Sequence, residues 1–503
     1  MSRKVSKSYD TKLKNNSTQV EFNNREIDIK NHPDLISVSE YVKNKFYFAT
    51  LAPGLDKPRQ NLDVHFFTID NELIYRNFYN DFGPLNLSCL YKYCWLVNNK
   101  RRNRKYFDRK IVHYTLDDDE NKRSNAAYLI SAYAMMYLGI NPHDTYQILV
   151  KGNSRPFKPF QDASIGNSHY HIRLQDCLNG LFRAITFGFL NFGDFNLDEY
   201  DKYEKLKYGD LNWIVPDKFI AFIGPSTEPG RPYHQPEAYI NYFLNNNVAA
   251  VVRLNRPCYD SKRFTRYGIA HVEMFLPDGS TPSKKILNQF LKLAETTAGP
   301  IAVHCKAGLG RTGCLIAAYL IKHYKMTAKE AIAWTRICRP GSVIGHQQSW
   351  LEKMQSELWL NGQQYRQQNY GDSDYFPHHK YGIYSVARMN DKKHDDLSSV
   401  SDESSTKKHK KNSDKKSILE SLSDKLLEKN LEKETNHGNG LLGIFHKMRS
   451  PRDPTSTNKS RTIDYPKKIP PHCFISDRVK PSHDASLNLT QGDYLNKIKS
   501  NKK

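Results

Sequence analysis

The chain has 503 residues, a hydrophobic fraction of 38% and a formal net charge of +22. This length allows two or three domains, but the hydrophobic fraction is below that of a typical globular protein, so we expect part of the chain not to fold. No apolar run approaches the length of a membrane span and the Lys-rich start has no secretory signal, so the sequence predicts a soluble intracellular protein that does not act at a membrane.

The eight cysteines and the positive charge exclude further classes of protein. The cysteines are scattered singly, which fits a reducing compartment and argues against structural disulfides and against a zinc site. No motif that reads DNA or RNA accompanies the charge, so we assign the charge to basic tails and expect no nucleic-acid partner. We also expect no metal ion and no other cofactor.

The chain divides into segments of different composition and hydrophobic pattern. Residues 1–30 are polar and rich in Asn and Lys, and we expect them to be disordered. The pattern then predicts one α/β domain over residues 31–195 and a second over residues 213–380. Both domains open on a similar strand-like run, residues 45–52 in the first and residues 218–224 in the second.

A second similarity lies deeper in both domains. Residues 111–114 precede a helical segment, as residues 303–305 do in the second domain. Two similarities in the same order predict an internal duplication of one α/β unit. Residues 196–212, between the copies, have the pattern of a linker helix that ends near Gly209.

In the second domain a cysteine follows a predicted buried strand and precedes a predicted helix. Residues 301–303 have the composition of the strand, and residues 314–324 have helical spacing. Backbone N–H groups of the loop between them, with the N-terminus of the helix, can surround an oxyanion. The same positive field, together with Arg311, lowers the pKa of Cys305 and favours its thiolate near neutral pH.

Neighbouring residues supply the other contacts that a phosphate ester needs. Arg311 has a planar fork that matches two phosphate oxygens, Thr312 can donate a hydrogen bond to the sulfur, and His304 can brace the loop. Asp278 lies upstream in a Pro- and Gly-rich loop and can protonate the leaving oxygen. The residues expected to surround the phosphate are Lys306, Ala307, Gly308, Leu309 and Gly310. This arrangement predicts covalent hydrolysis, in which the thiolate attacks phosphorus and water later releases the phosphocysteine.

Two residue pairs have alternative interpretations. Gln347 and Gln348 follow the turn at Gly345 and can position the hydrolytic water, but they also suit the start of a helix with no catalytic part. Cys177 and Arg183 repeat the Cys-x5-Arg spacing, but they follow a polar pair and continue as a helical pattern. We therefore interpret this second copy of the spacing as structural.

The first domain lacks the chemistry of the second. Tyr114 stands at the position of the nucleophile, and the acidic run Asp117–Glu120 fills the loop, where it would repel a phosphate. We therefore predict that the first domain is catalytically inactive.

The motif His304-Cys305-x5-Arg311-Thr312 resembles that of the protein tyrosine and dual-specificity phosphatase superfamily. Longer stretches are similar to the cell-division-cycle-fourteen family of mitotic-exit phosphatases. These stretches are residues 304–313, 337–345, 347–348, 79–86 and 210–214. The similarity extends from about residue 35 to residue 380.

The resemblance implies two tandem α/β domains of the dual-specificity phosphatase type, the first inactive and the second catalytic. It implies a protein phosphatase for phosphoserine, phosphothreonine and phosphotyrosine. It also implies a preference for phosphoserine followed by proline, the sites that cyclin-dependent kinases make. A role in mitotic exit and cytokinesis follows, with a location in the nucleus or nucleolus, in the cytoplasm, and at the centrosome or spindle.

By the same resemblance, an acidic face between the domains selects phosphoproteins with a basic residue after the phosphosite. Glu204 and Asp210 fit that face, whereas Lys207 stands where an acid is usual. The alternative is a solvated, charged helix face with no role in binding.

Two other functions stay open at this point. A phosphoinositide phosphatase shares most of the loop, but that branch has a second lysine where this chain has Leu309, and one lysine better suits a singly phosphorylated side chain. A binding module that holds phosphoproteins without turnover is the other function. The complete set of Cys305, Arg311 and Asp278 argues against it.

Residues 381–503 are polar and rich in Lys, and we predict a disordered basic tail. Residues 407–411 form a basic cluster that suits nuclear import, and residues 418–431 carry apolar side chains at helical spacing, which suits a partner-binding or export helix. Ser450-Pro451 suits a proline-directed kinase. We therefore expect the tail to bind regulators or kinases.

Overall fold

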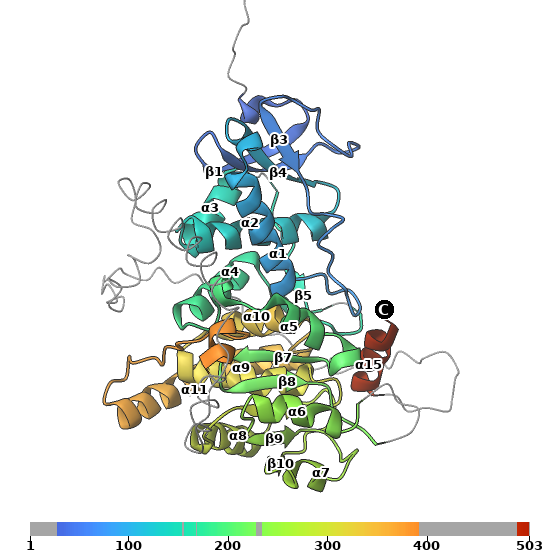
Figure 1. Ribbon diagram of the computed structural model, residues 1–503, viewed down its shortest axis with the longest axis vertical. Coiled ribbons are helices and arrows are strands. Elements are labelled where there is room, and N and C mark those ends of the chain that lie inside the picture. Colours follow the sequence, from blue (N-terminus) through green and yellow to red (C-terminus); the bar gives the residue numbers. More distant parts are fainter. Residues whose placement is uncertain (1–27, 153–154, 167, 228–233, 392–489, 502–503) are drawn as a thin grey trace, which may run out of the picture.

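The computed structural model describes residues 28–152, 155–166, 168–227, 234–391 and 490–501. Residues 1–27 of the predicted disordered start and the three motifs of the tail lie outside these ranges. The 3-10 helix η1 (Ile29–Asn31), in which Ile29 is buried, corrects the prediction of disorder for residues 29 and 30. Two α/β domains lie one beyond the other along the long axis of the molecule, and the helix nearest the C-terminus lies on the flank of the molecule (Figure 1).

A four-stranded sheet forms the centre of the first domain. Its strands are β1 (Leu35–Val42), β2 (Phe46–Leu51), β3 (Val64–Phe67) and β4 (Lys110–Leu116). Its helices are α1 (Leu87–Arg102), α2 (Glu120–Tyr137), α3 (Pro142–Gly152) and α4 (Leu174–Thr186). The short elements are the 3-10 helices η1 (Ile29–Asn31), η2 (Arg104–Tyr106) and η3 (Phe192–Asp194), and the strand pair β5 (Phe160–Gln161) and β6 (His171–Ile172). Every residue of β2 is buried, as expected for a central strand covered on both faces.

The second domain is built around a five-stranded sheet. Its strands are β7 (Leu211–Val215), β8 (Phe219–Phe222), β9 (Ala250–Arg253), β10 (Ala270–Glu273) and β11 (Ile301–His304). Its helices are α6 (Glu237–Asn245), α7 (Lys262–Thr265), α8 (Lys284–Thr296), α9 (Gly310–Tyr324), α10 (Ala328–Cys338) and α11 (His346–Tyr370). Far along the chain, α15 (Gln491–Asn501) packs against this domain.

The two sheets have the same core arrangement. The strand order is β1-β2-β4-β3 in the first domain and β10-β9-β11-β8-β7 in the second. The first strand of each copy, β1 or β7, is antiparallel to its neighbour, and the other pairs are parallel. The second domain therefore repeats the first and adds β10 at one edge, which confirms the predicted pair of α/β domains.

The strand register corrects one detail of the duplication. β2 pairs with β4, and β8 with β11, so that the first phenylalanine of the inner strand faces an isoleucine in each domain. Counted from those isoleucines, Ile111 and Ile301, the residue at the position of Cys305 is Thr115 rather than Tyr114. The sequence comparison misplaces it by one residue because it matches two Val-His pairs that lie at different positions of the register.

The two domains share one apolar core, and α4 and α10 pack across the junction. They approach closely enough that a Cβ on Gly180 would lie 2.6 Å from the carbonyl oxygen of Glu330. Cys177 of α4 is buried in this core, and Arg183 of the same helix donates to the carbonyl oxygen of Tyr324 at 2.7 Å. The Cys177 and Arg183 pair therefore belongs to helix packing, in agreement with its structural interpretation.

The predicted linker helix over residues 196–212 is too long. The helix α5 (Leu197–Tyr203) and the 3-10 turn η4 (Leu206–Tyr208) occupy most of the segment, and β7 then begins at Leu211. Gly209 has a φ of +121° and ends the helical turns, as its type predicts. Residues 211 and 212 therefore belong to the sheet of the second domain.

The predicted start of the tail at residue 381 is also wrong. Ile383 and Tyr384 are buried, and Ser385 forms a β-bridge with Phe195. The ring of Tyr384 packs against the rings of Phe195 and Tyr200, so this segment covers the linker. At the other end of the tail, the helix α15 corrects the prediction of disorder for residues 491–501.

Candidate active site

The loop between β11 and α9 lies at the carboxyl ends of the parallel strands. β11 ends at His304 and α9 begins at Gly310, so Cys305 is the first residue of the loop. Gly308 has a φ of +67°, and a Cβ there would lie 1.9 Å from the carbonyl oxygen of Phe222, so only glycine fits. The partial positive charge at the N-terminus of α9 favours an anion at this loop.

The surroundings of Cys305 favour its thiolate, although the side chain is only 3% exposed. Burial by itself would raise the pKa of the thiol, but the charge of Arg311 and hydrogen bonding from Thr312 outweigh it, so the pKa of Cys305 is lowered. The Thr312 hydroxyl is buried and has no nitrogen or oxygen partner among the described residues, which leaves it free to donate to the sulfur. The loop therefore holds its cysteine in the nucleophilic form.

His304 braces the loop through a chain of hydrogen bonds. Its Nδ1 donates to the carbonyl oxygen of Cys305 at 2.9 Å, and its Nε2 lies 2.7 Å from the hydroxyl of Tyr259. The same hydroxyl lies 2.9 Å from Nε2 of His271. Burial lowers the pKa of His304 to about 3, so its ring is neutral and keeps one donor and one acceptor in this chain.

Arg311 joins the cysteine loop to the loop that carries Asp278. Its Nη2 lies 2.9 Å from Oδ1 of Asp278, and its Nη1 donates to the carbonyl oxygen of Leu276 at 2.8 Å. Its Nε is buried and has no partner within the described part of the chain, so this N–H remains for a phosphate oxygen. The structure thus brings together the nucleophile, the phosphate ligand and the acid that the sequence predicts.

Arg339 supports the loop from behind, a role that the sequence patterns do not predict. Its guanidinium donates to the carbonyl oxygens of Gly308 at 2.7 Å and Ala307 at 3.2 Å. It also pairs with Asp210 at 2.8 Å and donates to Asn212 at 2.7 Å. The loop is therefore tied to the residue that is predicted to read the substrate. Arg339 lies in the Cys-Arg-Pro-Gly stretch that resembles the family, and this stretch is the sequence signal from which its role could have been predicted.

The two glutamines at the start of α11 have different surroundings. Gln347 donates to the carbonyl oxygen of Ser280 at 3.1 Å, in the loop of the proposed acid, and a Cβ on Gly310 would lie 2.9 Å from its Oε1. Gln348 instead accepts a hydrogen bond from Arg336 at 2.6 Å, inside the core. Consecutive side chains of a helix project about 100° apart, so only one of the pair can face the site. The structure brings Gln347 to the catalytic loop and not Gln348, which corrects the catalytic role predicted for Gln348.

The two acidic residues predicted to face the substrate also differ. Glu204 accepts hydrogen bonds from Asn86 at 2.7 Å and from the Tyr200 hydroxyl at 3.2 Å, and burial raises its pKa. It therefore joins the linker to the first domain. Asp210 is 5% exposed and binds the ammonium group of Lys499. Of the two, Asp210 is the one that the structure shows in contact with a cation from outside the domain.

The helix α15 lies over the catalytic loop, which no pattern in the tail predicts. Leu495 packs in a small apolar cluster with Ala307 and Leu309 of the loop. Asp493 pairs with Lys306, the residue after the nucleophile. The helix α15 therefore covers the loop at Lys306, Ala307 and Leu309.

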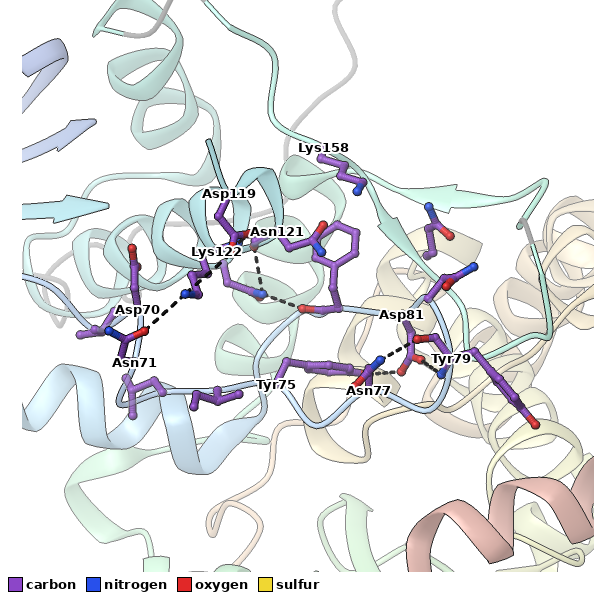
Figure 2. A pocket seen from close by; sticks show the side chains of 17 residues that line it. Asp70, Asn71, Tyr75, Asn77, Tyr79, Asp81, Asp119, Asn121, Lys122 and Lys158 are labelled. Atoms are coloured by element: carbon purple, nitrogen blue, oxygen red, sulfur yellow. Dashed lines mark hydrogen bonds and ion pairs between the residues drawn. The ribbon is translucent and has the colours of Figure 1, made fainter. Parts of the chain in front are cut away.

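A cavity of about 580 Å³ opens in the first domain. Residues between 69 and 82 line it with the start of α2 and with Lys158, and Figure 2 shows Asp70 toward one end and Tyr79 toward the other. Tyr79 also packs against the apolar cluster that contains Leu495. The first domain therefore forms a wall beside α15 and the catalytic loop.

The counterpart of the cysteine loop in the first domain has no nucleophile of this kind. The hydroxyl of Thr115 donates to both carboxylate oxygens of Asp70 at 3.0 Å. Asp117 is buried and pairs with Arg155 at 2.7 Å. A threonine held by a carboxylate in an acidic loop does not attract a phosphate, which supports the prediction of an inactive first domain.

Within the described ranges, no three side chains of His, Cys, Asp or Glu come together as metal ligands. No helix of those ranges is both long and apolar enough to cross a membrane.

A buried cysteine with a lowered pKa, an arginine six residues on and an acid on a neighbouring loop define the class of cysteine-dependent phosphatases. Comparison with family models agrees with this class. A model described as "Dual specificity protein phosphatase, N-terminal half" matches residues 40–184. A model for the DSP-PTPase phosphatase of polymorphic toxin systems matches residues 228–325.

Comparison with curated proteins gives relatives of one kind. Human dual specificity protein phosphatase CDC14A is 51% identical over 337 residues, which cover 66% of this chain and 56% of that protein. Human CDC14C is 50% identical over 66% of this chain and 74% of its own length, and mouse CDC14B is 49% identical over 66% of this chain and 68% of its own length. The chain belongs to the CDC14 family of dual specificity protein phosphatases. The match spans a little over half the length of CDC14A.

Proposed function

We propose that this chain is a protein phosphatase of dual specificity, which removes phosphate from serine, threonine and tyrosine side chains through a phosphocysteine. The observation that carries the proposal is the contact of Arg311 with Asp278 next to Cys305, whose pKa is lowered. Family membership supports it, because the relatives named above are dual specificity protein phosphatases.

In the first step, the thiolate of Cys305 attacks phosphorus and the bond from phosphorus to the ester oxygen breaks. Arg311 holds phosphate oxygens, and the N-terminus of α9 offsets the charge that gathers on them. Asp278, in its protonated form, gives its proton to the leaving oxygen. The products of this step are the phosphocysteine and the free hydroxyl side chain of the substrate.

In the second step, Asp278 is a carboxylate and takes a proton from water while the water oxygen attacks phosphorus. The bond from phosphorus to sulfur breaks, and the sulfur leaves as a thiolate that Thr312 stabilises. Gln347, which donates to the carbonyl oxygen of Ser280 and lies beside Gly310, orients the water in this proposal. Inorganic phosphate leaves and the enzyme returns to its starting state.

Replacing Thr312 with valine keeps the shape of the side chain but removes its hydroxyl. The pKa of Cys305 should then rise toward its ordinary value. Because the thiolate is the reactive form, the acid limb of kcat/KM should move to higher pH, measured with p-nitrophenyl phosphate across the acid and neutral range. Thr335→Val is the control, since Thr335 is buried on α10 and donates to the carbonyl oxygen of Ala331. An acid limb at the same pH in both variants would contradict the role of Thr312.

We further propose that the preferred substrates are phosphoserine-proline sites made by cyclin-dependent kinases, with a basic residue after the phosphosite. The family resemblance supports the first part, and the pairing of Asp210 with Lys499 supports the second. The same resemblance supports a role in mitotic exit and cytokinesis. It also supports a location in the nucleus or nucleolus, in the cytoplasm, and at the centrosome or spindle. Phosphoproteins are then the partners of the catalytic site.

An Asp210→Asn chain should lose about tenfold or more in kcat/KM on phosphoserine-proline peptides that carry a lysine after the phosphosite, because a buried, charge-assisted hydrogen bond is lost. The amide keeps an acceptor for Arg339, so activity on p-nitrophenyl phosphate should change little. The measurement compares two peptides that differ only in that lysine, which is alanine in the second. Glu204→Gln is the matched control and should leave the ratio of the two peptides unchanged.

Equal losses on both peptides, or an equal change of ratio in Glu204→Gln, would contradict the assignment of the basic residue to Asp210. The same panel, extended to phosphothreonine and phosphotyrosine peptides and to a phosphoinositide, tests the proposed function. Turnover of the phosphoinositide alone would contradict a protein phosphatase.

A further inference from the structure

A short segment, Ser342 to Gly345, joins α10 to α11 and lies against the catalytic loop. The N–H of Val343 donates to the carbonyl oxygen of Leu309 at 3.4 Å, and a Cβ on Gly313 would lie 3.1 Å from Cβ of Ser342. Val343 has a φ of +61°, which is strained for a β-branched residue. A strained backbone persists only where its surroundings hold it, so the contacts of this segment decide where α11 begins.

The first domain supplies the contact at the start of α11. Asp162 follows β5, which lies where the two domains meet, and its Oδ2 accepts the N–H of Gly345 at 2.6 Å (Figure 1). Gly345 is the N-cap of α11, and as a glycine it has no side chain to offer. In a capping box the third residue of the helix would accept this N–H, but here that residue, Gln348, accepts from Arg336 instead. A carboxylate from the other domain therefore completes the cap.

Asp162 is held firmly in this position. It is 2% exposed, and its Oδ1 accepts the hydroxyl of Ser164 at 2.9 Å, which fixes the rotation of the carboxylate. The next residue, Ala163, packs in the same apolar cluster as Ile344 and Leu309. The carboxylate and the segment that it binds are thus fixed to each other and to the catalytic loop.

Asp162 also balances the charge of Arg336, which holds the same segment. The guanidinium of Arg336 donates to the carbonyl oxygens of Ser342 at 3.0 Å and Val343 at 2.9 Å. Burial lowers the pKa of Arg336, and the charge of Asp162 opposes that change. One carboxylate therefore supports the segment both directly, at Gly345, and through the arginine.

The segment in turn fixes the side chain of Gln347. The N–H of Ile344 donates to Oε1 of Gln347 at 3.0 Å, and Nε2 of the same amide donates to the carbonyl oxygen of Ser280, in the loop of Asp278. Ile344 lies next to Gly345, so a shift of the capped N–H also moves the N–H that holds the glutamine. The place of Gln347 at the catalytic loop therefore depends on a residue of the first domain.

We propose that Asp162 is a positioning residue for hydrolysis of the phosphocysteine, which acts by fixing the start of α11 and with it the side chain of Gln347. The inference rests on the proposed function, because it concerns the second step of that reaction. The first domain then takes part in the chemistry of the second, although its own loop has no nucleophile. The first step, attack of Cys305 on the substrate, does not use Gln347 and is independent of Asp162.

The test measures the two steps separately with p-nitrophenyl phosphate and the full chain. In Asp162→Ala the water is oriented less well, so kcat and KM should fall together by about threefold or more. The ratio kcat/KM should stay the same, because it contains only the steps up to release of p-nitrophenol. Rapid mixing should show a burst of p-nitrophenol whose amplitude approaches one per active site, since the phosphocysteine accumulates.

Further variants separate positioning from a loss of structure. Gln347→Ala should give the same pattern, and adding Asp162→Ala to it should cause no further loss, because both act through one side chain. Asp162→Asn keeps an oxygen that accepts the N–H of Gly345, and it should recover most of kcat. Asp162→Glu moves the carboxylate by one methylene without removing its charge. It replaces Asp162→Ala if that chain does not fold, and it should give the same fall of kcat and KM.

Asp34→Ala is the matched control. Asp34 is 3% exposed and accepts the backbone N–H of Arg59 at 2.7 Å, so its loss removes the same kind of contact from the first domain without touching α11. It should lower thermal stability and leave kcat, KM and the burst unaltered.

Unaltered kinetics in Asp162→Ala, or an equal fall of kcat and kcat/KM without a burst, would overturn the inference. Losses that add in the double variant, or the same change in Asp34→Ala, would also overturn it. In each of these cases the unaltered chain still turns over. A chain that shows neither turnover nor phosphocysteine in its unaltered form would overturn the proposed function, and the inference with it.

Discussion

The Cys305→Ser chain is expected to lose turnover of every phosphorylated substrate by at least about a thousandfold while it still binds phosphopeptides. A serine hydroxyl stays protonated in a field that ionises a thiol, so the nucleophile is lost. The loop remains, because its shape depends on Gly308 and on the support of Arg339. Initial rates on a phosphoserine peptide and on p-nitrophenyl phosphate, with binding by anisotropy, measure both parts of the prediction.

The chain offers a matched control for this experiment. Cys177 has an arginine at the same spacing but lies inside the core on α4. Cys177→Ser should keep turnover and lower thermal stability, since a buried hydroxyl without a partner is unfavourable. Phosphatase activity retained by the purified Cys305→Ser protein would contradict the mechanism.

Replacing Asp278 with alanine should lower kcat/KM on phosphoserine peptides by about 10²–10⁴-fold and on p-nitrophenyl phosphate by far less. An alkoxide leaving group needs a proton, whereas p-nitrophenolate leaves without one. The comparison uses kcat/KM because this rate constant covers only the steps up to cleavage of the substrate ester. The later step, in which Asp278 takes a proton from water, therefore does not affect it.

The control for the acid is Asp260→Ala, since Asp260 is an exposed aspartate of the same domain. It should leave both rate constants close to those of the unaltered chain. If Asp278→Ala slowed both substrates equally, its loop would have a structural role and another group would protonate the leaving oxygen.

The catalytic loop was predictable from the sequence because its determinants are contiguous. Strand, cysteine, glycines, arginine and helix follow one another in residues 301–324, so local patterns fix both the fold and the chemistry of the segment. Asp278 lies in a separate stretch, but the glycine and prolines around it mark a loop, and the mechanism requires an acid.

Residues whose contacts depend on the folded structure were harder to predict. Arg339 binds carbonyl oxygens of the loop, which carry no side-chain signal in a sequence. The choice between Gln347 and Gln348 depends on the rotation of α11, and the choice between Tyr114 and Thr115 on strand register. A one-residue error moves a side chain to the opposite face of a strand. In a helix the same error rotates the side chain by about 100° around the helix axis.

The docked helix α15 could not be predicted from local sequence patterns, for a different reason. Residues 490–501 are polar and short, and their apolar face consists of little more than Leu495 and Ile498. Such a segment has weak helical preference by itself, so composition alone predicts disorder. The residues that stabilise it by contact lie far earlier in the chain, and Asp210, Asp278 and Lys306 are among them.

The central claim, a phosphocysteine at Cys305, is tested most directly by following the phosphate through one turnover. An excess of the unaltered chain is mixed with a phosphoserine peptide labelled in its phosphate, denatured rapidly and digested. The account predicts label on the peptide that contains Cys305, both with and without EDTA, before it appears as inorganic phosphate. Label that passes to water without appearing on Cys305, or turnover that EDTA stops and a divalent ion restores, would contradict it.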